Sequence, residues 1–274
     1  MKKVKIGACD WALPGGGVYA PRIAAQFGLD ALSLNLGFQK NNYPLSETNM
    51  QKCYLEDQQK YGIEYVAIAV DDFNNICIFA PKGTPDYDAT RTVFRKAVQT
   101  AYALGASLIQ IPGFGVSSVS DTNGFDGTVD AFQALCDIAG EKGITVALEN
   151  LMLPGEFKAL YEAIQRPNFY AHYDSQNYYW FKGYNQVEVL SDLYKYMCPQ
   201  IHVKDGRDHM SGALLGQGNS DFEGTINLLQ EKEFEGYFLL ENYYDQIPLY
   251  LEHSDPYELL KKDIDILKNA IKEW

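Results

Sequence analysis

Four side chains that can bind metal ions or move protons stand at the ends of short apolar segments. Each segment has the length and composition of a buried strand. In an α/β barrel the carboxyl ends of the parallel strands carry the chemistry, so residues placed there are functional candidates. The four residues are Glu149 after 144–148, Asp174 after 169–173, His202 after 199–201 and Glu241 after 236–240.

These four residues offer carboxylate oxygens and an imidazole nitrogen, which hard or borderline divalent cations accept together. We therefore expect Glu149, Asp174, His202 and Glu241 to bind a divalent metal ion, Mn²⁺ first, with Mg²⁺, Co²⁺ or Zn²⁺ as alternatives. Such an ion could hold two oxygens of a hydroxy-ketone and stabilise the enediolate formed when the neighbouring carbon loses its proton. Glu149 and Glu241 would then lie on opposite faces of the substrate, one removing a proton while the other returns one.

The elements that must position these residues alternate along the chain as eight strands and eight helices. The length of 274 residues is close to the ~250 typical of a (β/α)8 barrel. An open doubly wound sheet is the structural alternative, but the glycines at 15–17 do not make its usual fingerprint after the first strand. No linker or shift in composition divides the chain. We expect residues 1–274 to form one α/β domain, a single (β/α)8 TIM barrel.

Three charged residues follow His202 closely: Lys204, Asp205 and Arg207. They could bind substrate hydroxyls or a phosphate, and they could equally form ion pairs across the mouth of the barrel. His172 lies two residues before Asp174, one layer deeper on the same strand face. We expect it to be a hydrogen-bonded core histidine rather than a metal ligand.

Composition excludes several classes of protein. The formal net charge of -13 disfavours binding to nucleic acid through a broad basic patch. No apolar run is long enough to span a bilayer, and the basic N-terminus is not followed by a signal-peptide core. The five cysteines are scattered, without a CxxC pair, which fits reduced thiols. We expect a cytoplasmic protein that binds neither nucleic acid nor membrane.

At these residues the sequence resembles the sugar phosphate isomerases/epimerases, xylose isomerase-like TIM barrels that include ketose 3-epimerases and inosose-processing enzymes. The resemblance lies mainly in the C-terminal half of the chain. It implies that Glu149, Asp174, His202 and Glu241 bind the metal, and that the two glutamates act as acid and base in the epimerases. The matching stretches are 146–150, Asp174 at its strand end, 201–205, 216–218 followed by Asp221-Phe222, and 236–241.

The sequence departs from the family at one position that contacts substrate. The family commonly has a histidine three residues after the strand-end aspartate, whereas this chain has Asn177. Asparagine can hydrogen-bond a hydroxyl but cannot carry positive charge. The family's substrate arginine is expected after the strand-seven histidine, where Arg207 lies nearby. We expect Asn177, Lys204, Asp205, Arg207 and Glu156 to contact the substrate.

The first functional hypothesis is a metal-dependent epimerase or isomerase of a ketose or ketose phosphate, acting by glutamate-mediated proton transfer beside a carbonyl. A related alternative is an inosose-type dehydratase or isomerase. Hydrolysis of DNA at abasic sites, known on this barrel type, is disfavoured by the acidic surface and by only four histidines. A non-catalytic sugar-binding subunit is the remaining alternative. The resemblance also implies a homo-oligomer, a dimer or a tetramer.

Overall fold

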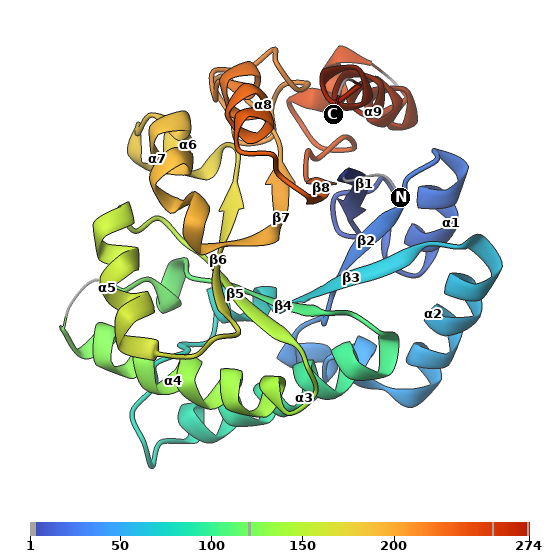
Figure 1. Ribbon diagram of the computed structural model, residues 1–274. Coiled ribbons are helices and arrows are strands. Elements are labelled where there is room, and N and C mark those ends of the chain that lie inside the picture. Colours follow the sequence, from blue (N-terminus) through green and yellow to red (C-terminus); the bar gives the residue numbers. More distant parts are fainter. Residues whose placement is uncertain (1–3, 120–121, 254, 273) are drawn as a thin grey trace. The chain divides into compact units, whose positions relative to one another are not determined.

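Strands and helices alternate along the computed structural model, which describes residues 4–119, 122–253, 255–272 and 274 (Figure 1). Lys2 and Lys3 of the basic N-terminus therefore lie outside the described residues. Internal contacts divide the chain into two compact units. The first unit comprises Met1–Ser33, Asp57–Glu64 and Tyr173–Trp274, and the second unit comprises Leu34–Glu56 and Tyr65–His172.

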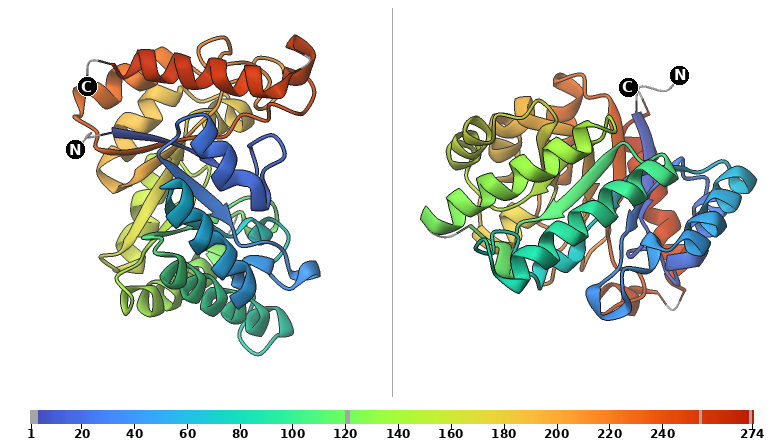
Figure 2. Two further views of the ribbon diagram at one scale, coloured as in Figure 1. Left: turned by 90° about the vertical axis from the view of Figure 1, so that its right-hand side faces the viewer. Right: turned by 90° about the horizontal axis from the view of Figure 1, so that it is seen from below.

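The first unit contains the sheet segment that carries most of the candidate residues. Strand β1 pairs in parallel with β2 and with β8, and β8 also pairs in parallel with β7. The start of β1 and the end of α9 lie side by side (Figure 2), and their residues line one hollow at the surface. The elements are β1 Val4–Cys9, α1 Ala20–Gln26, β2 Ala31–Asn35, α6 Asn177–Lys182, α7 Gln186–Leu193, β7 Met197–Val203, α8 Phe222–Glu231, β8 Gly236–Leu240 and α9 Pro256–Ala270.

The second unit contains three consecutive parallel pairs, β3 with β4, β4 with β5, and β5 with β6. Its strands are buried on both faces, as expected for parallel strands covered by helices. Helix α4 packs against α3 and α5. The elements, some of which cross into the first unit, are α2 Thr48–Tyr61, β3 Glu64–Ala69, α3 Pro85–Leu104, β4 Leu108–Pro112, α4 Thr122–Gly140, β5 Thr145–Glu149, α5 Pro154–Ile164 and β6 Phe169–Asp174.

Local sequence signals account for the ends of these helices. In α3 the Thr84 side chain accepts a hydrogen bond from Tyr87 N at 3.3 Å, and Pro85 occupies the first helical turn. Gly105 then ends the helix in the left-handed conformation, with φ +74°. Helix α9 begins in the same manner, because Asp255 accepts from Tyr257 N at 2.9 Å.

The structure differs from the predicted elements in one instructive place. The eight predicted helices did not include one directly after Asp174, where the structure has the short helix α6. Asp174 Oδ1 accepts hydrogen bonds from Gln176 N and Asn177 N, each at 2.8 Å. A strand-end carboxylate therefore also satisfies free N–H groups at the start of the next helix, which periodicity alone does not reveal.

Among the described residues, no helix combines the length and the apolar character needed to cross a bilayer.

Candidate metal centre and active site

His202 and Glu241 are neighbours because β7 and β8 pair in register. Val203 pairs with Leu240, and Glu241 N continues the ladder by donating to Val203 O at 3.0 Å. This pairing keeps His202 inside β7, one residue before its end. His202 Nδ1 lies 3.4 Å from Glu241 Oε2, and both side chains are buried.

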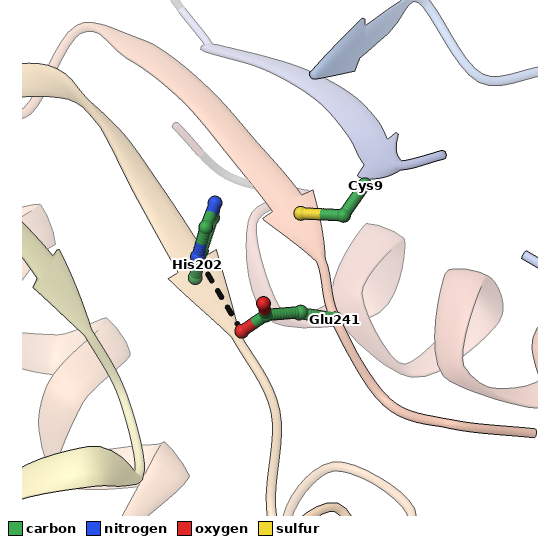
Figure 3. A group of neighbouring side chains, drawn as sticks. All are labelled: Cys9, His202 and Glu241. Carbon is green, nitrogen blue, oxygen red and sulfur yellow. Dashed lines mark ion pairs between the residues drawn. The ribbon is translucent and has the colours of Figure 1, made fainter. Parts of the chain in front are cut away.

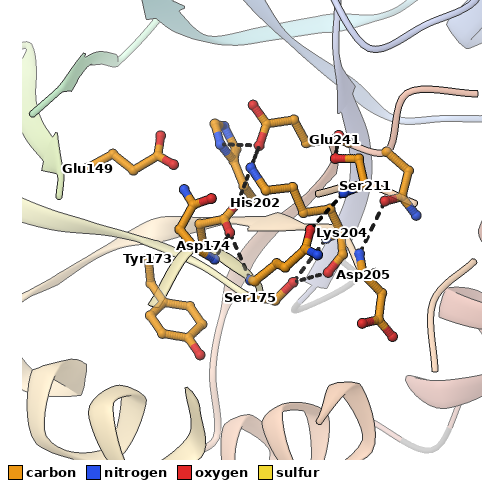
Figure 4. Close-up of polar contacts among 12 residues, drawn as sticks. Glu149, Tyr173, Asp174, Ser175, His202, Lys204, Asp205, Ser211 and Glu241 are labelled. Carbon is orange, nitrogen blue, oxygen red and sulfur yellow. Dashed lines mark hydrogen bonds and ion pairs between the residues drawn. The ribbon is translucent and has the colours of Figure 1, made fainter. Parts of the chain in front are cut away.

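Asp174 joins this pair through the end of β6. Ser175 N donates to His202 O at 3.0 Å, and Ser175 Oγ exchanges hydrogen bonds with the backbone of Lys204. These bonds place Asp174 beside the end of β7 (Figure 4). One ligand-capable atom from each of Asp174, His202 and Glu241 lies within 4.8 Å of the others.

Lys204 supplies the positive charge of this cluster. Its Nζ lies 2.6 Å from Glu241 Oε2 and 3.0 Å from Asp174 Oδ2, and the side chain is buried (Figure 4). A buried ammonium between two buried carboxylates offsets much of the desolvation cost of all three groups. Of the two roles that the sequence leaves open for Lys204, ion pairing is therefore present, and its partners are two candidate metal ligands.

The pKa values of Asp174 and Glu241 shift in opposite directions in this environment. Burial opposes ionisation of Glu241, but the charges of Lys204 and His202 and their hydrogen bonds outweigh it and hold its pKa well below the usual range. Burial raises the pKa of Asp174, since Lys204 opposes this effect only in part and the nearby Glu241 charge reinforces it. The environment therefore favours the ionised form of Glu241 more strongly than that of Asp174.

Strand β1 and the residues after it add two side chains that the sequence did not single out. Trp11 Nε1 donates to Glu241 Oε1 at 3.0 Å, and its ring meets the His202 ring edge-on at 5.9 Å. Cys9, at the end of β1, is fully buried, and its sulfur lies within 4.8 Å of ligand-capable atoms of His202 and Glu241 (Figure 3). Both residues could have been selected from the sequence by the rule that selected Glu241, because they lie at or just after the end of a strand.

Asp205 holds the loop between β7 and α8 in place by accepting hydrogen bonds from it. Its two carboxylate oxygens accept hydrogen bonds from four backbone N–H groups and one hydroxyl. A Cβ on Gly218 would lie 2.0 Å from Asp205 Oδ1, which explains a glycine at this position of the Gly-Gln-Gly stretch. The donors are Gly206 N, Gly216 N, Gly218 N, Ser220 N and Ser220 Oγ.

A second buried carboxylate, Asp263 of α9, supports the end of β8. It accepts hydrogen bonds from Asn242 Nδ2 at 2.7 Å, Leu215 N at 2.8 Å and Tyr244 OH at 3.0 Å. Asn242 follows Glu241 directly, and its Oδ1 accepts from Asp205 N at 3.1 Å. Burial raises the pKa of Asp263 to about 7.

The other substrate-binding candidates of this unit lie in different surroundings. Asn177 is buried at the start of α6, beside Asp174. Arg207 is exposed, and its Nε donates to Gln217 O at 2.5 Å. Their contact with a substrate stays a prediction.

In the second unit, Glu149 ends β5 as the sequence predicted. Its side chain is buried, and Oε2 accepts a hydrogen bond from Gln110 Nε2 at 2.5 Å. Ligand-capable atoms of Glu149 and His172 lie within 4.8 Å of each other. Glu156 is exposed, and its Oε2 accepts from Leu153 N at 2.8 Å at the start of α5.

The donor set of the first unit fits a divalent cation. Asp174 and Glu241 provide anionic oxygens and His202 provides an imidazole, all buried and mutually close. This combination suits hard or borderline divalent ions. The structure thus contains a cluster able to bind a metal, without specifying which metal.

Comparisons with known proteins agree with this arrangement. The family model described as xylose isomerase-like TIM barrel matches residues 21–270. The chain is 26% identical over 227 residues to 2-epi-5-epi-valiolone 7-phosphate 2-epimerase of Actinoplanes sp., covering 82% of each chain. It is 26% identical over 263 residues to L-ribulose-5-phosphate 3-epimerase UlaE of Escherichia coli, covering 88% of this chain and 87% of the relative.

A solved structure, the xylose isomerase domain protein from Planctomyces limnophilus, superposes with a TM-score of 0.79 at 15% identity, covering 98% of this chain and 97% of that chain. A likeness at this identity concerns the fold, and the match of the family model covers most of the sequence. The chain therefore belongs to the xylose isomerase-like TIM barrel family, and its fold is the (β/α)8 barrel predicted from the sequence.

Proposed function

We propose that the protein is a divalent-metal-dependent epimerase or isomerase of a ketose or ketose phosphate. The observation that carries the proposal is the buried group of Asp174, His202 and Glu241 at adjoining strand ends, with the Lys204 ammonium against both carboxylates. The two relatives named above are epimerases of phosphorylated substrates. A cluster that can bind a metal and also accept a proton suits that class of reaction.

We propose that Asp174, His202 and Glu241 hold the metal together with Glu149 of the second unit, and that the ion is Mn²⁺. When bound, the ion would polarise oxygens of the substrate and so acidify the carbon beside the carbonyl. The proposal for Glu149 rests on its buried place at a strand end and on the hydrogen bond from Gln110, which fixes the orientation of its carboxylate.

Glu241 is the proposed base, because its carboxylate is ionised, lies at a strand end beside the proposed metal ligands and can accept a proton. Trp11 donates to Oε1, and Lys204 and His202 contact Oε2, so the carboxylate is held at both oxygens. Glu149 is the proposed partner that returns a proton to the opposite face of the substrate. An epimerase or isomerase would exchange protons without loss of water from the substrate, whereas a dehydratase would release water.

We propose that Lys204 contacts a substrate oxygen when a divalent ion binds Asp174 and Glu241 and neutralises their negative charges. Its ammonium lies beside both carboxylates of the cluster, whereas Arg207 is exposed. We further propose that Asn177, Arg207 and Glu156 contribute to substrate binding, and that Asp205 does so through the loop that it holds. We also propose that residues 1–274 act as one domain and that the protein is a homo-oligomer.

The test is exchange of substrate hydrogen in D2O, followed by NMR. Chelator-treated protein and protein reloaded with Mn²⁺ would be incubated with L-ribulose 5-phosphate, L-ribulose, other ketoses and inososes. We expect metal-dependent deuterium at a carbon beside the carbonyl and the appearance of an epimer or an aldose. A dehydrated product would instead support the inosose-type alternative.

The variant His202→Ala tests whether His202 binds the metal. It should lower the bound metal, measured by elemental analysis after dialysis, together with exchange. Full metal occupancy in this variant would remove His202 from the ligand set. Absence of exchange with every substrate class, despite bound metal in the unmodified protein, would contradict the proposed reaction.

A further inference from the structure

Cys9 places a thiol beside two side chains of the candidate centre. The residue ends β1, it is fully buried, and its sulfur lies within 4.8 Å of ligand-capable atoms of His202 and Glu241 (Figure 3). All three residues belong to the first unit. Ligand atoms around one tetrahedral zinc ion lie roughly 3–4 Å apart, so small side-chain movements would suffice to bring the three donors onto one ion.

We propose that Cys9, His202 and Glu241 form a second ligand set, which binds a thiophilic divalent ion such as Zn²⁺ or Cd²⁺. This set shares His202 and Glu241 with the oxygen-rich set of the proposed function and replaces Asp174 by the Cys9 sulfur. The two sets therefore exclude each other. Soft thiolate sulfur favours Zn²⁺ and Cd²⁺ over Mn²⁺ and Mg²⁺, which prefer oxygen ligands.

The distribution of charge favours this set in one respect. A divalent ion bound by the Cys9 thiolate and the Glu241 carboxylate is neutralised by these two negative charges. The ion pair between Lys204 and Asp174 at 3.0 Å can then remain in place. The oxygen-rich set must take both Asp174 and Glu241 from Lys204, leaving a buried ammonium to find another partner.

Binding releases the proton of the Cys9 thiol and any proton that charges the His202 imidazole, because both groups ligate in their deprotonated forms. The Cys9 thiol loses its proton to the buffer, and the sulfur donates an electron pair to the ion, so a metal–sulfur bond replaces the sulfur–hydrogen bond. His202 and Glu241 provide the other protein ligands. Three protein ligands leave a fourth position of a tetrahedral ion open.

The test uses Cd²⁺ and Co²⁺ as spectroscopic probes of the chelator-treated protein. A metal–thiolate bond adds a charge-transfer absorption in the ultraviolet. We expect this band in the unmodified protein and its loss in Cys9→Ser, with Cd²⁺ affinity lowered at least about tenfold. Mn²⁺ affinity should change far less, because the oxygen-rich set lacks Cys9.

Cys198→Ser is the matched control. Cys198 is also buried in the first unit, on β7, and its sulfur contacts Gln200 O at 3.4 Å. We expect this variant to keep the band. Circular dichroism and thermal unfolding of the metal-free variants, including Cys9→Ala, would verify that loss of the band is not loss of the fold.

Two outcomes would overturn the proposal: Cd²⁺ binding without a thiolate band, or a band that persists in Cys9→Ser. Neither depends on turnover, so the site can fail while the proposed reaction stands, and the reverse. One consequence does rest on the proposed function. Zn²⁺ held by Cys9 would occupy Glu241 and inhibit Mn²⁺-dependent exchange, and Cys9→Ser would relieve that inhibition.

Discussion

Two pairs of buried carboxylates in the first unit serve different purposes. Asp174 and Glu241 face a lysine ammonium and, for Glu241, a histidine and a tryptophan. Asp205 faces mainly backbone N–H donors, and Asp263 accepts from Leu215 N and from the buried side chains of Asn242 and Tyr244. Burial is similar in both pairs, so burial alone does not identify the reactive carboxylate.

The difference lies in whether the partner can leave. A lysine side chain can move aside for a metal ion or a substrate, whereas backbone N–H groups can do so only if the loop unfolds. Asp205 and Asp263 therefore hold the loop between β7 and α8 and the end of β8 in place. Glu241 and the Oδ2 atom of Asp174 face side chains that can exchange partners, whereas Asp174 Oδ1 is held by Gln176 N and Asn177 N.

The largest predicted effect is on the rate of deuterium exchange when Glu241 is replaced. Glu241→Gln should reduce metal-dependent deuterium exchange by about 100- to 10,000-fold, because an amide cannot accept the proton. Folding should be largely preserved, since Lys204 keeps its ion pair with Asp174. Exchange rates and thermal unfolding would be measured on the same preparations. Near-normal exchange in this variant would refute Glu241 as the acid or base.

The second prediction concerns the dependence of stability on pH at Asp263. Burial raises the pKa of Asp263 to about 7 in the folded protein, and the usual value is near 4. Between these values the folded form holds a proton that the unfolded form has released. The free energy of unfolding should therefore fall as pH rises from about 4 to 7, by up to about 4 kcal/mol, and this contribution should level off above pH 7.

Asp263→Asn is the control, because an amide does not titrate. Its unfolding free energy, from urea denaturation at several pH values, should show a flatter profile between pH 4 and 7 than the unmodified protein. Identical slopes for the two proteins would show that Asp263 does not titrate in this range.

The same comparison shows what sequence could predict. Glu149, Asp174, His202 and Glu241 were selected as candidates because strand periodicity locates strand ends, and the active sites of such barrels lie at the ends of parallel strands. The strands were predicted to within a few residues for the same reason. Periodicity is a local signal, so it predicts strands and helices better than it predicts the contacts between them.

Interactions between distant segments were not accessible in this way. The hydrogen bonds of Asp263 to Leu215 and Asn242 join residues with no shared sequence pattern. Asp205 was predicted to contact the substrate or to form an ion pair across the mouth of the barrel, and its role in the loop was not predicted. The donors that surround it come from a loop whose path depends on the folded backbone.

The third prediction tests the scaffold side of the comparison. Asp205→Asn should lower the free energy of unfolding by about 3 kcal/mol, because an amide nitrogen would face N–H groups that now donate to a carboxylate oxygen. Ser220→Ala, which removes one hydroxyl donor, should cost about 1 kcal/mol. Urea denaturation measures both. A smaller loss in Asp205→Asn than in Glu241→Gln would reverse the assignment of roles.

The smallest predicted effect lies outside the buried pairs, at Glu156. Its exposed carboxylate accepts from Leu153 N at the start of α5, and the sequence also made it a candidate for substrate binding. Glu156→Ala should lower the free energy of unfolding by about 0.5–1 kcal/mol, because the N–H group loses its partner.

Glu156→Gln separates the two roles, because glutamine keeps an oxygen that can accept from Leu153 N but lacks the negative charge. We expect its stability to stay close to that of the unmodified protein. If Glu156 also binds substrate through its charge, KM rises in Glu156→Gln although the helix start is intact. An unchanged KM in that variant, with the stability loss confined to Glu156→Ala, would assign Glu156 to the scaffold with Asp205 and Asp263.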